Sequence, residues 1–504
     1  MTDLLGSELL GSELLGSECL DSELLASFGV QNKQIICETG ETLQILAIAR
    51  FLPNQRLVCK CLFNQSLVFA KIFIGLRASS HAGREASGAK ALLSANILTP
   101  QLLLQTTYQN QPVILYAAIE NSVNAEDFVR SADFLGRCDL VKKLTQTVAL
   151  HHNAHLMQTD IHLKNFLVEK DKVYTLDGDG IRQFAQLSPK QAMQNLAVLW
   201  SKFDVLDIEK WQQSLTKTYV DTSAWNKSLA SEKLTKLANF QRLKVASYYA
   251  DKKVFRPCTD IKVTALRGIF YAASRAYENI DLPVTIKQLD QLMSAQNIIK
   301  NGNTCTVATA QLSDATIVIK RYNIKSVWHG LSRALRPSRA AISWANAHRL
   351  QLLGIASAKP VALLERRRFG LRGRAYFLSE CIDAPDVAQY FAQTQNKTER
   401  AEAVKNIVTL FYKLYLLHIS HGDMKFSNIK MQGSQPVLID LDSMHQHAFI
   451  NQAAHARDLQ RFMRNWQNDN ALYNAFVKTF KVVYPDDSML IKAGIKTNKE
   501  IVSQ

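Results

Sequence analysis

The sequence predicts an α+β protein with two similar domains in tandem, each an antiparallel β-sheet followed by a mainly helical part. Three observations support this prediction. A chain of 504 residues is too long for a single hydrophobic core. Each half starts with short apolar or alternating runs separated by turn residues, and continues with longer helical patterns. A polar motif also occurs once in each half, with the same spacing to a later aspartate.

Three segments are expected along the chain. Residues 4–25 repeat a pentapeptide related to Leu-Leu-Gly-Ser-Glu, and a period of five keeps no face of a helix or strand apolar. We therefore expect residues 1–30 to form a low-complexity tail outside the fold. A loop at residues 281–283 separates two helical patterns. It predicts a first domain over residues 31–283 and a second over residues 284–504.

The composition is that of an ordinary globular protein, with 47% hydrophobic and 21% charged residues. No apolar run reaches the ~18–20 residues of a membrane-spanning helix. The first residues also lack the basic and apolar regions of a signal peptide. The 8 cysteines include no CxxC pair, which is typical of reduced structural thiols. We therefore expect a cytoplasmic protein.

Positive charge is concentrated in the second half. The formal net charge is +16, and residues 287–504 contain 29 Lys and Arg against 16 Asp and Glu, which gives +13. A basic surface favours anionic partners such as nucleic acid, acidic lipid headgroups, or a phosphorylated or carboxylated substrate. The basic runs are not interleaved with aromatic residues, as a base-stacking surface requires, so we expect no nucleic-acid partner.

The first half is expected to begin with a sheet and one helix. Its expected strands are short and apolar or alternating, and span residues 43–49, 57–63, 66–73, 102–108 and 112–118. Lys71 lies near the end of the third strand, and Glu85 lies in the helical pattern over residues 81–93. Glu120 follows the last strand and is the expected hinge between the sheet and the helical part.

The second half repeats this order with one change. Gly302 lies in a turn between strand-like runs, where a glycine can let the backbone fold over phosphates, although one glycine is a weak signal. Lys320 lies near the end of the next apolar run, and Glu380 is the expected counterpart of Glu120. Ser343 occupies the position of the helix glutamate, so that carboxylate is missing from the second half.

The motif that occurs twice is an Asp-x4-Asn loop followed by an aspartate at the end of a strand. Its members are Asp160, Asn165 and Asp177 in the first half, and Asp423, Asn428 and Asp440 in the second. In each copy 17 positions separate the two aspartates, and the copies lie 263 positions apart. One such match is a common accident. Two matches at the same spacing, each after a strand lysine, are not.

This arrangement is typical of phosphoryl transfer by enzymes of the protein-kinase-like type. The loop aspartate takes the proton of the acceptor hydroxyl, and the loop asparagine and strand aspartate bind Mg²⁺ through oxygen. The strand lysine holds the α and β phosphates of ATP and pairs with the helix glutamate. The expected catalytic residues are Asp160 and Asp423, and the expected metal ligands are Asn165, Asp177, Asn428 and Asp440. The expected ATP-binding residues are Lys71, Glu85, Glu120, Gly302, Lys320 and Glu380.

Both halves depart from the usual kinase pattern. Gln158 and Thr159 stand where kinase loops usually carry histidine or arginine, and only the second half keeps a histidine, His421. The first half also lacks a recognisable glycine-rich loop. Asn195 and Asp458 each lie 18 positions after the strand aspartate, and we expect each to start a helix that braces the catalytic loop. These intervals are too short for a protein-kinase activation loop, which argues against protein substrates.

The sequence resembles the Kdo/heptose lipopolysaccharide kinase family. In the first half the resemblance rests on Arg84 with Glu85 and on residues 97–100, 158–167 and 176–179. In the second half it rests on residues 320–323, 338–340, 343–344, 421–428, 438–442 and 457–466. It covers almost everything after residue 35 as two tandem copies. It implies two protein-kinase-like bilobal domains, each with an antiparallel N-lobe sheet and a mainly helical C-lobe.

The resemblance also implies a function. ATP and Mg²⁺ would be the cofactors, and the acceptor would be a heptose or Kdo hydroxyl of the lipopolysaccharide inner core, carried on lipid A. The site would face the cytoplasmic leaflet, where a basic protein can dock peripherally on the anionic inner face of the inner membrane.

Two alternatives stay open at this point. One copy can be a pseudokinase that serves as a scaffold or acceptor-binding module. The protein can instead be a small-molecule phosphotransferase of the aminoglycoside or choline kinase type. His-Gly-Asp at 421–423 and Leu-Ile-Asp at 438–440 also suit those enzymes. The sequence leaves the oligomeric state open.

Overall fold

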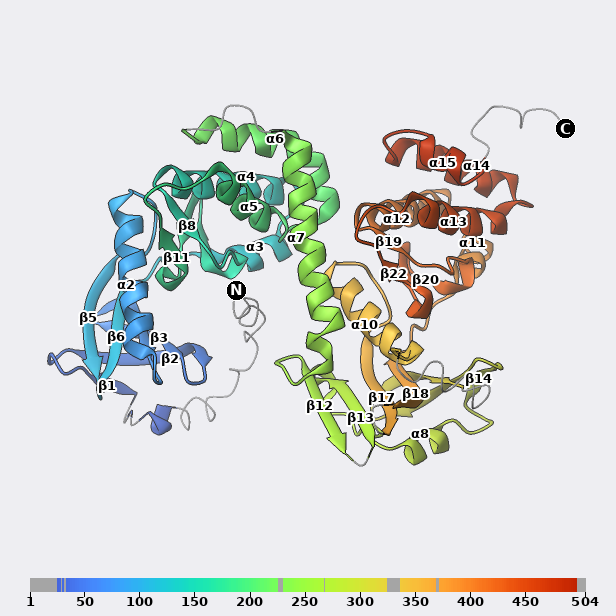
Figure 1. The fold of residues 1–504 in the computed structure, drawn as a ribbon, viewed down its shortest axis with the longest axis horizontal. Helices are drawn as coiled ribbons and strands as arrows, with labels where there is room; N and C mark the ends of the chain where they lie inside the picture. The colour runs from blue at the N-terminus through green and yellow to red at the C-terminus, as the bar shows by residue number, and fades with distance from the viewer. Residues whose placement is uncertain are drawn as a thin grey trace. The chain divides into compact units, whose positions relative to one another are not determined.

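The computed structural model describes residues 25–28, 30, 33–224, 230–266, 268–323, 336–368 and 371–495. The chain divides into two compact units after Arg242. Each unit contains an antiparallel sheet and a mainly helical part, as Figure 1 shows. The predicted α+β class is therefore confirmed.

The fold begins earlier than the expected tail boundary at residue 30. Leu25 and Val30 are buried in the core of the first sheet, 4% and 6% exposed. The ring of Phe28 packs edge-on against that of Phe51, with centroids 5.8 Å apart. Apolar side chains are thus buried where low-complexity sequence was expected. The repeats before Leu25 lie outside the described residues.

The sheet of the first unit has six strands in the order β1-β2-β3-β4-β6-β5. These strands are β1 (Gln34–Ile36), β2 (Thr42–Leu52), β3 (Arg56–Phe63), β4 (Ser66–Phe73), β5 (Leu102–Tyr108) and β6 (Gln111–Ala117). Burial alternates along β3, as expected when one face of a strand meets the core. Helix α2 (Ala78–Ser94) packs its small residues, including Ala82 and Ala86, against Ile114 and Tyr116 of β6.

The helical part of the first unit carries the first Asp-x4-Asn loop. Its helices are α3 (Ala125–Ser131), α4 (Phe134–Asn153), α5 (Pro189–Trp200) and α6 (Val205–Thr222). Its short strands are β7 (Val123–Asn124), β8 (Leu156–Gln158), β9 (Phe166–Glu169), β10 (Lys172–Thr175) and β11 (Ile181–Gln183). The 3-10 turns η1 (Leu163–Asn165) and η2 (Gly178–Gly180) complete it. Ser188 and Gln191 form a capping box that starts α5 at Pro189.

The sheet of the second unit has seven strands in the order β12-β13-β17-β18-β16-β15-β14. They are β12 (Ile261–Leu266), β13 (Ile269–Ser274), β14 (Ile298–Asn301), β15 (Cys305–Leu312), β16 (Ala315–Tyr322), β17 (Pro360–Arg368) and β18 (Leu371–Glu380). The 3-10 turn η4 (Arg275–Tyr277) and helices α8 (Ile286–Leu292) and α10 (Arg339–Leu352) accompany this sheet. Ser338 caps α10 by accepting the backbone N–H of Ala341.

The helical part of the second unit has an aromatic core. Its helices are α11 (Val387–Gln393), α12 (Lys397–Leu416), α13 (Gln452–Met463), α14 (Asn470–Val483) and α15 (Ser488–Lys492). Its strands are β19 (Ile419–Ser420), β20 (Ile429–Gln432), β21 (Gln435–Leu438) and β22 (His445–Gln446), and its 3-10 turns are η5 (Phe426–Asn428), η6 (Leu441–Ser443) and η7 (Arg464–Trp466). The ring centroids of Phe411 and Phe476 each lie 5.1 Å from that of Phe462. Among the described helices, none is both long and apolar enough to span a bilayer.

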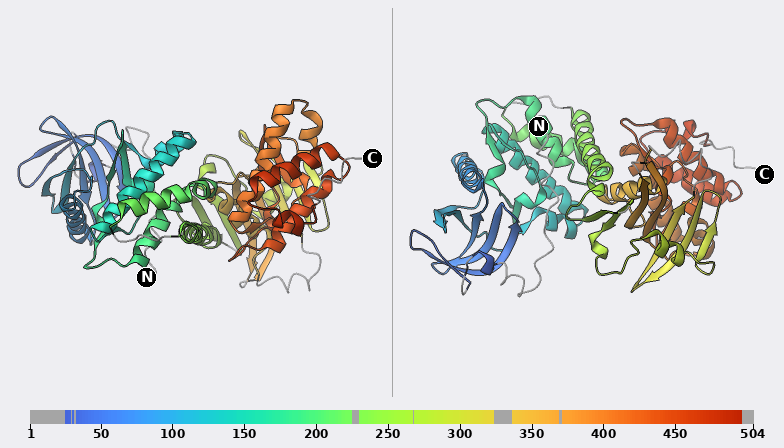
Figure 2. Two further views of the ribbon diagram at one scale, coloured as in Figure 1. Left: turned by 90° about the horizontal axis from the view of Figure 1, so that it is seen from above. Right: turned by 60° about the horizontal axis from the view of Figure 1, so that its bottom comes forward.

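The division of the chain falls within helix α7 (Ser231–Asp251), before the loop at 281–283 that was expected to separate the two domains. Strand pairing explains the difference, because β13 pairs with β17 and thereby adds β12 and β13 to the second sheet. Arg242 belongs to the first unit, where its guanidinium donates to the carbonyl oxygens of Trp200 and Phe203. The right-hand view of Figure 2 shows the blue strands of the first sheet and the teal and green helices of the same unit from a second side.

Helix α2 approaches the turn that follows the first strand aspartate at two glycines. A Cβ added to Gly88 would lie 2.0 Å from the carbonyl oxygen of Gly178, so neither backbone leaves room for a side chain. We expect Gly88→Ala to lower the free energy of unfolding by about 1–3 kcal/mol, because the helix must move away from the turn. Chemical denaturation measures this effect.

Gly83 of the same helix provides the matched control, since a Cβ there meets nothing within 4 Å. Gly83→Ala should leave stability unchanged or raise it by up to about 1 kcal/mol, because alanine favours the helix. Equal stability of the two variants would contradict the close packing of α2 on η2.

Candidate active sites

Both Asp-x4-Asn loops have the same hydrogen-bonded conformation. The side-chain Nδ2 of Asn165 donates to the carbonyl oxygen of Asp160 at 3.1 Å, and Nδ2 of Asn428 donates to that of Asp423 at 2.8 Å. The residue before each strand aspartate donates its backbone N–H to the asparagine carbonyl, at 2.8 Å in the first unit and 3.0 Å in the second. Each strand aspartate is therefore held beside its loop. The amide nitrogens are used, which directs each Oδ1 elsewhere.

The two strand aspartates share a left-handed backbone. Asp177 has φ 68° and ψ 73°, and Asp440 has φ 61° and ψ 61°. A residue other than glycine in this region costs of order 1–3 kcal/mol, although aspartate tolerates it better than most. The same conformation at both positions ends the strand and starts a 3-10 turn. The two aspartates therefore have the same backbone geometry.

The glutamine that replaces the loop histidine in the first unit makes the same bond. Nε2 of His421 donates to the carbonyl oxygen of Ile439 at 3.1 Å, and Nε2 of Gln158 donates to that of Leu176 at 3.2 Å. Both side chains are fully buried. Burial lowers the pKa of His421, so the ring is neutral and carries its proton on Nε2. The departure noted at Gln158 thus preserves the contact between the loop and the strand aspartate.

Asp458 and Asn195 brace the Asp-x4-Asn loops as expected, but from the middle of α13 and α5 and not from their first residues. The carboxylate of Asp458 accepts the backbone N–H groups of His421 and Gly422 at 2.6 and 2.9 Å. In the first unit, Nδ2 of Asn195 donates to the carbonyl oxygen of Gln158 at 2.8 Å. A helix in each unit therefore fixes the backbone just before the loop aspartate.

The expected lysine–glutamate pair is present in the first unit. Nζ of Lys71 lies 2.5 Å from a carboxylate oxygen of Glu85, which is 1% exposed. The hydroxyl of Tyr116 donates to the same carboxylate at 3.0 Å, and the backbone N–H of Asp179 donates to its other oxygen at 3.0 Å. Lys71 also lies 3.4 Å from Asp177. Sheet, helix and strand aspartate thus meet at one lysine.

Arg56, the first residue of β3, also binds the strand aspartate of the first unit. Its two terminal nitrogens donate to the two carboxylate oxygens of Asp177 at 2.7 and 3.2 Å. Both side chains are nearly buried, 13% and 14% exposed. Burial alone would raise the pKa of Asp177, but the charges of Arg56 and Lys71 outweigh it and hold that pKa well below its usual range. The carboxylate is ionised and already paired.

The lysine of the second unit has a different set of partners. Lys320 contacts Asp440, and it lies 3.0 Å from Asp442, two positions further on. Arg339, at the start of α10, donates to Asp442 at 2.8 Å. Burial would raise the pKa of Asp442, but Lys320 and Arg339 lower it further than burial raises it. Asp442 therefore supplies the second carboxylate that the helix does not.

Comparison of helices α2 and α10 shows how Asp442 takes the place of the helix glutamate. Ser343, at the position of Glu85, is buried and hydrogen-bonds the hydroxyl of Tyr322 at 2.9 Å. Four positions earlier, Arg339 holds the second aspartate of its unit. The residue at the same place in the first unit is His81, which contacts Asp179 at 2.8 Å. A basic residue on the first turn of the helix thus binds the second aspartate in both units.

The loop aspartate of the second unit lies among basic groups. Asp423 is 2.9 Å from Arg461 of α13 and 3.3 Å from Lys425, and it accepts a second bond from Nδ2 of Asn428 at 3.0 Å. Arg461 and Lys425 thus place two positive charges beside this carboxylate. Arg50 of β2 lies near the loop aspartate of the first unit, since its charge interacts with those of Asp160 and Asp177.

Strand register corrects the expected match between Glu120 and Glu380. Lys71 pairs with Ile114 and Lys320 pairs with Phe377, so Glu380 corresponds to Ala117 and the counterpart of Glu120 is Asp383. Glu380 also accepts a hydrogen bond from the hydroxyl of Tyr277 at 2.6 Å, and Glu120 is exposed in the turn after β6. The spacing from each glutamate to its loop aspartate is similar, so the sequence does not reveal that the two positions differ by three residues.

Gly302 does lie in a hairpin turn, between β14 and β15. The first unit has an equivalent turn, because the N–H of Ile74 donates to Gln55 as that of Asn323 donates to Thr304. The counterpart of Gly302 in that turn is Pro53. Gly302 donates its N–H to the carbonyl oxygen of Cys305 at 3.0 Å, which closes the turn.

Two functional candidates were missing from the sequence reasoning. Arg56 and Arg461 contact Asp177 and Asp423 from elements that carry no recognised motif. Arg56 lies two positions before Val58, which pairs with Lys71, so alternation along β3 places it on the same face as the lysine. The alternation along β3 is visible in the sequence, but placing Arg56 on the face of Lys71 also requires the pairing of β3 with β4.

The donor sets of the two units differ in how well they fit Mg²⁺. In the second unit, the carboxylate of Asp440 is 34% exposed and Oδ1 of Asn428 is not used by the loop, which gives a hard cation the oxygen ligands it requires. In the first unit, both oxygens of Asp177 are bound by Arg56. That site does not fit a cation while the pair is intact.

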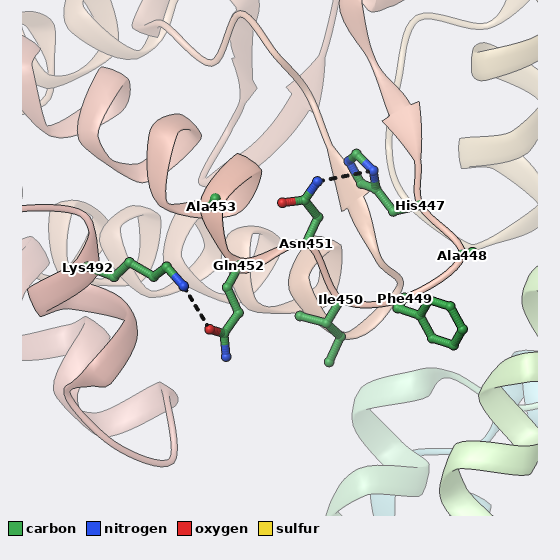
Figure 3. A pocket seen from close by; sticks show the side chains of 8 residues that line it. All are labelled: His447, Ala448, Phe449, Ile450, Asn451, Gln452, Ala453 and Lys492. Carbon is green, nitrogen blue, oxygen red and sulfur yellow. Dashed lines mark hydrogen bonds between the residues drawn. The ribbon is translucent and has the colours of Figure 1, made fainter.

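A shallow pocket lies beside α13 and contains none of the residues discussed above. Figure 3 shows its lining, which consists of His447, Ala448, Phe449, Ile450, Asn451, Gln452, Ala453 and Lys492. The side chain of Phe449 is 83% exposed, and Lys492 donates to Gln452 at 3.0 Å. We assign it no part in phosphoryl transfer.

The comparison with known families gives a match in the second unit. Residues 288–484 match the lipopolysaccharide kinase (Kdo/WaaP) family. The match begins within α8 and ends after α14, so it lies entirely in the second unit. No curated protein matches the chain. The match supports a lipopolysaccharide kinase for the second unit.

The bracing contact of the first unit should make its stability depend on pH. His152 is buried, hydrogen-bonds Tyr219 at 2.9 Å and Asn195 at 3.2 Å, and burial lowers its pKa to about 4. A depressed folded-state pKa stabilises the fold fully above the unfolded value of about 6.5, and this contribution is lost as the pH falls towards 4. We expect a loss of up to about 3 kcal/mol over that range.

His152→Gln isolates this effect, because glutamine keeps a hydrogen-bonding group but does not titrate. Urea denaturation of both proteins between pH 7 and pH 4 should show the wild type losing stability relative to the variant. Parallel stability curves would show that His152 does not titrate with folding.

Proposed function

We propose that this protein is an ATP-dependent phosphotransferase that phosphorylates a heptose or Kdo hydroxyl of the lipopolysaccharide inner core. The proposal rests on two features of the second unit. The family match covers it, and the same unit brings Lys320, Asp423, Asn428 and Asp440 into one hydrogen-bonded arrangement. Phosphoryl transfer depends mainly on positioning and charge stabilisation, and these residues supply both.

The residues of the second unit have distinct roles in this proposal. Lys320 would bind the α and β phosphates of ATP, and Asn428 and Asp440 would hold Mg²⁺, which would neutralise charge on the phosphates. Asp442 positions Lys320 in place of a helix glutamate. Lys320 must exchange Asp440 for the phosphates when ATP binds, while its contact with Asp442 keeps it in the site.

Asp423 orients the acceptor. Its carboxylate accepts a hydrogen bond from the sugar hydroxyl and takes the proton as the phosphoryl group is transferred. Arg461 and Asn428 hold the carboxylate in place. Because Arg461 is 52% exposed, it can also contact a negatively charged group on the acceptor.

The charge of the chain suits this acceptor. Inner-core lipopolysaccharide is anionic, and the net charge of +16 favours its approach and peripheral docking on an anionic cytoplasmic leaflet. We therefore propose lipopolysaccharide core on lipid A as partner, a location at the inner face of the inner membrane, and no nucleic-acid partner.

We also propose that both units are protein-kinase-like domains in tandem. The shared register of the strand lysines, the same loop bonds and the left-handed aspartates support this relationship. The pair between Arg56 and Asp177 favours a role for the first unit other than transfer, as a scaffold or binding module. No observation favours an aminoglycoside or choline kinase activity.

Substitution of the loop aspartates tests the proposal. Asp423→Asn should lower the rate of phosphate transfer from ATP to purified inner-core lipopolysaccharide by about 10²–10⁴-fold, because asparagine cannot take the proton. Asp160→Asn should have a much smaller effect. Transfer of radiolabelled phosphate gives the rate, and Asp314→Asn, in the exposed turn between β15 and β16, is the control.

Full activity of Asp423→Asn would refute the role of the second unit. Transfer to aminoglycosides or choline, with none to lipopolysaccharide, would refute the acceptor. Equal losses in Asp160→Asn and Asp423→Asn would show two active units.

A further inference from the structure

The first unit contains a buried arginine where its counterpart has none. Register gives the comparison, since Arg56 pairs with Phe73, two residues after Lys71, and Cys305 pairs with Tyr322, two residues after Lys320. Cys305 thus occupies the place of Arg56 in the second unit. Among the described residues of that unit, Asp440 has Lys320 as its one ion-pair partner. Within the described part of the chain, a guanidinium binds the strand aspartate in the first unit alone.

A second arginine lies on the same face of the first sheet. Arg50 pairs with Val58, which pairs with Lys71, so cross-strand register places Arg50, Arg56 and Lys71 on one face. The charge of Arg50 interacts with those of Arg56, Asp177 and Asp160, and its buried Nε has no hydrogen-bond partner among the described residues. Lys300, the counterpart of Arg50, is exposed.

The two arginines leave buried hydrogen-bond donors without acceptors. Nε of Arg50 and Nε of Arg56 are both buried, and neither has a partner among the described residues. A buried donor without an acceptor is unfavourable, and a guanidinium satisfies such donors best with a phosphate or carboxylate. The carboxylate of Asp177 already occupies the terminal nitrogens of Arg56. The remaining donors therefore suit an external anion.

A divalent cation and Arg56 compete for the same two oxygens. Guanidinium keeps its charge at any physiological pH and binds a carboxylate with a matching planar geometry. A cation at Asp177 would leave Arg56 buried without its partner, which is strongly unfavourable. In the second unit this competition is absent, because the residue at that position is Cys305.

We propose that the first unit binds the phosphate groups of a nucleotide without a divalent cation, with Arg56 in place of the metal and Arg50 as a second phosphate-binding guanidinium. Lys71 supplies the third positive charge, and Asp177 holds Arg56 in position. The first unit is then a nucleotide-binding module that does not transfer phosphate. This inference deepens the proposed function by dividing its tasks, and it depends on that function only for the second unit.

The test is isothermal titration of the full chain with a non-hydrolysable ATP analogue, first in excess EDTA. We expect one binding site under these conditions. Arg56→Gln and Arg50→Gln should each weaken it by at least about tenfold, because each removes a charge-assisted hydrogen bond. Lys320→Ala should leave it within about twofold of the wild type. Arg50→Gln is the safer variant for folding, because Nε of Arg50 has no hydrogen-bond partner among the described residues, whereas Arg56 is paired with Asp177.

Two outcomes in EDTA would overturn the inference. The first is that the folded wild type binds no analogue. The second is that Lys320→Ala abolishes binding, while Arg50→Gln and Arg56→Gln leave it intact. A repeat in Mg²⁺ separates this inference from the proposed function. A second site that appears with Mg²⁺ and is lost in Lys320→Ala supports the kinase role of the second unit. An EDTA site without that second site would refute the kinase role and leave the inference standing.

Discussion

An ion pair between a strand lysine and a left-handed aspartate connects the sheet of each unit to its helical part. Lys71 meets Asp177, and Lys320 meets Asp440, across 106 and 120 positions of sequence. Residues so distant meet only if the sheet, the helix packed on it and the loop that holds the aspartate are all in place. The buried glutamine or histidine before each loop, and the helix residue that hydrogen-bonds the loop backbone, also hold the loop in place.

The charged groups around the lysine and the aspartate differ between the two units. The first unit adds Glu85 from the helix and Arg56 from the sheet, so the lysine and the aspartate each gain another partner. The second unit has neither, and its lysine takes Asp442 from the turn after the strand. A buried carboxylate already paired with arginine resists a metal ion, whereas a partly exposed one can accept it. Equivalent backbones can therefore support different chemistry.

Local patterns predicted much of this structure. The Asp-x4-Asn loops, the strand lysines and the pair between Lys71 and Glu85 all follow from residue types at short, regular spacings. Features that depend on strand register did not follow. Glu380 was matched to the wrong residue, and Arg56 was missed, because spacing in sequence does not reveal which residues face each other. The unit boundary was misplaced for the same reason, since β13 pairs with the distant β17.

The two units share one framework, and we infer that they differ in metal binding because Arg56 pairs with Asp177 in the first unit. Crystals of the full chain grown with Mn²⁺ and a non-hydrolysable ATP analogue test it most directly, because anomalous scattering locates the metal. Manganese bound by Asn428 and Asp440, with Arg56 still paired to Asp177, is the predicted result. Manganese between Asn165 and Asp177, with Arg56 displaced, would show that Arg56 does not take the place of the metal.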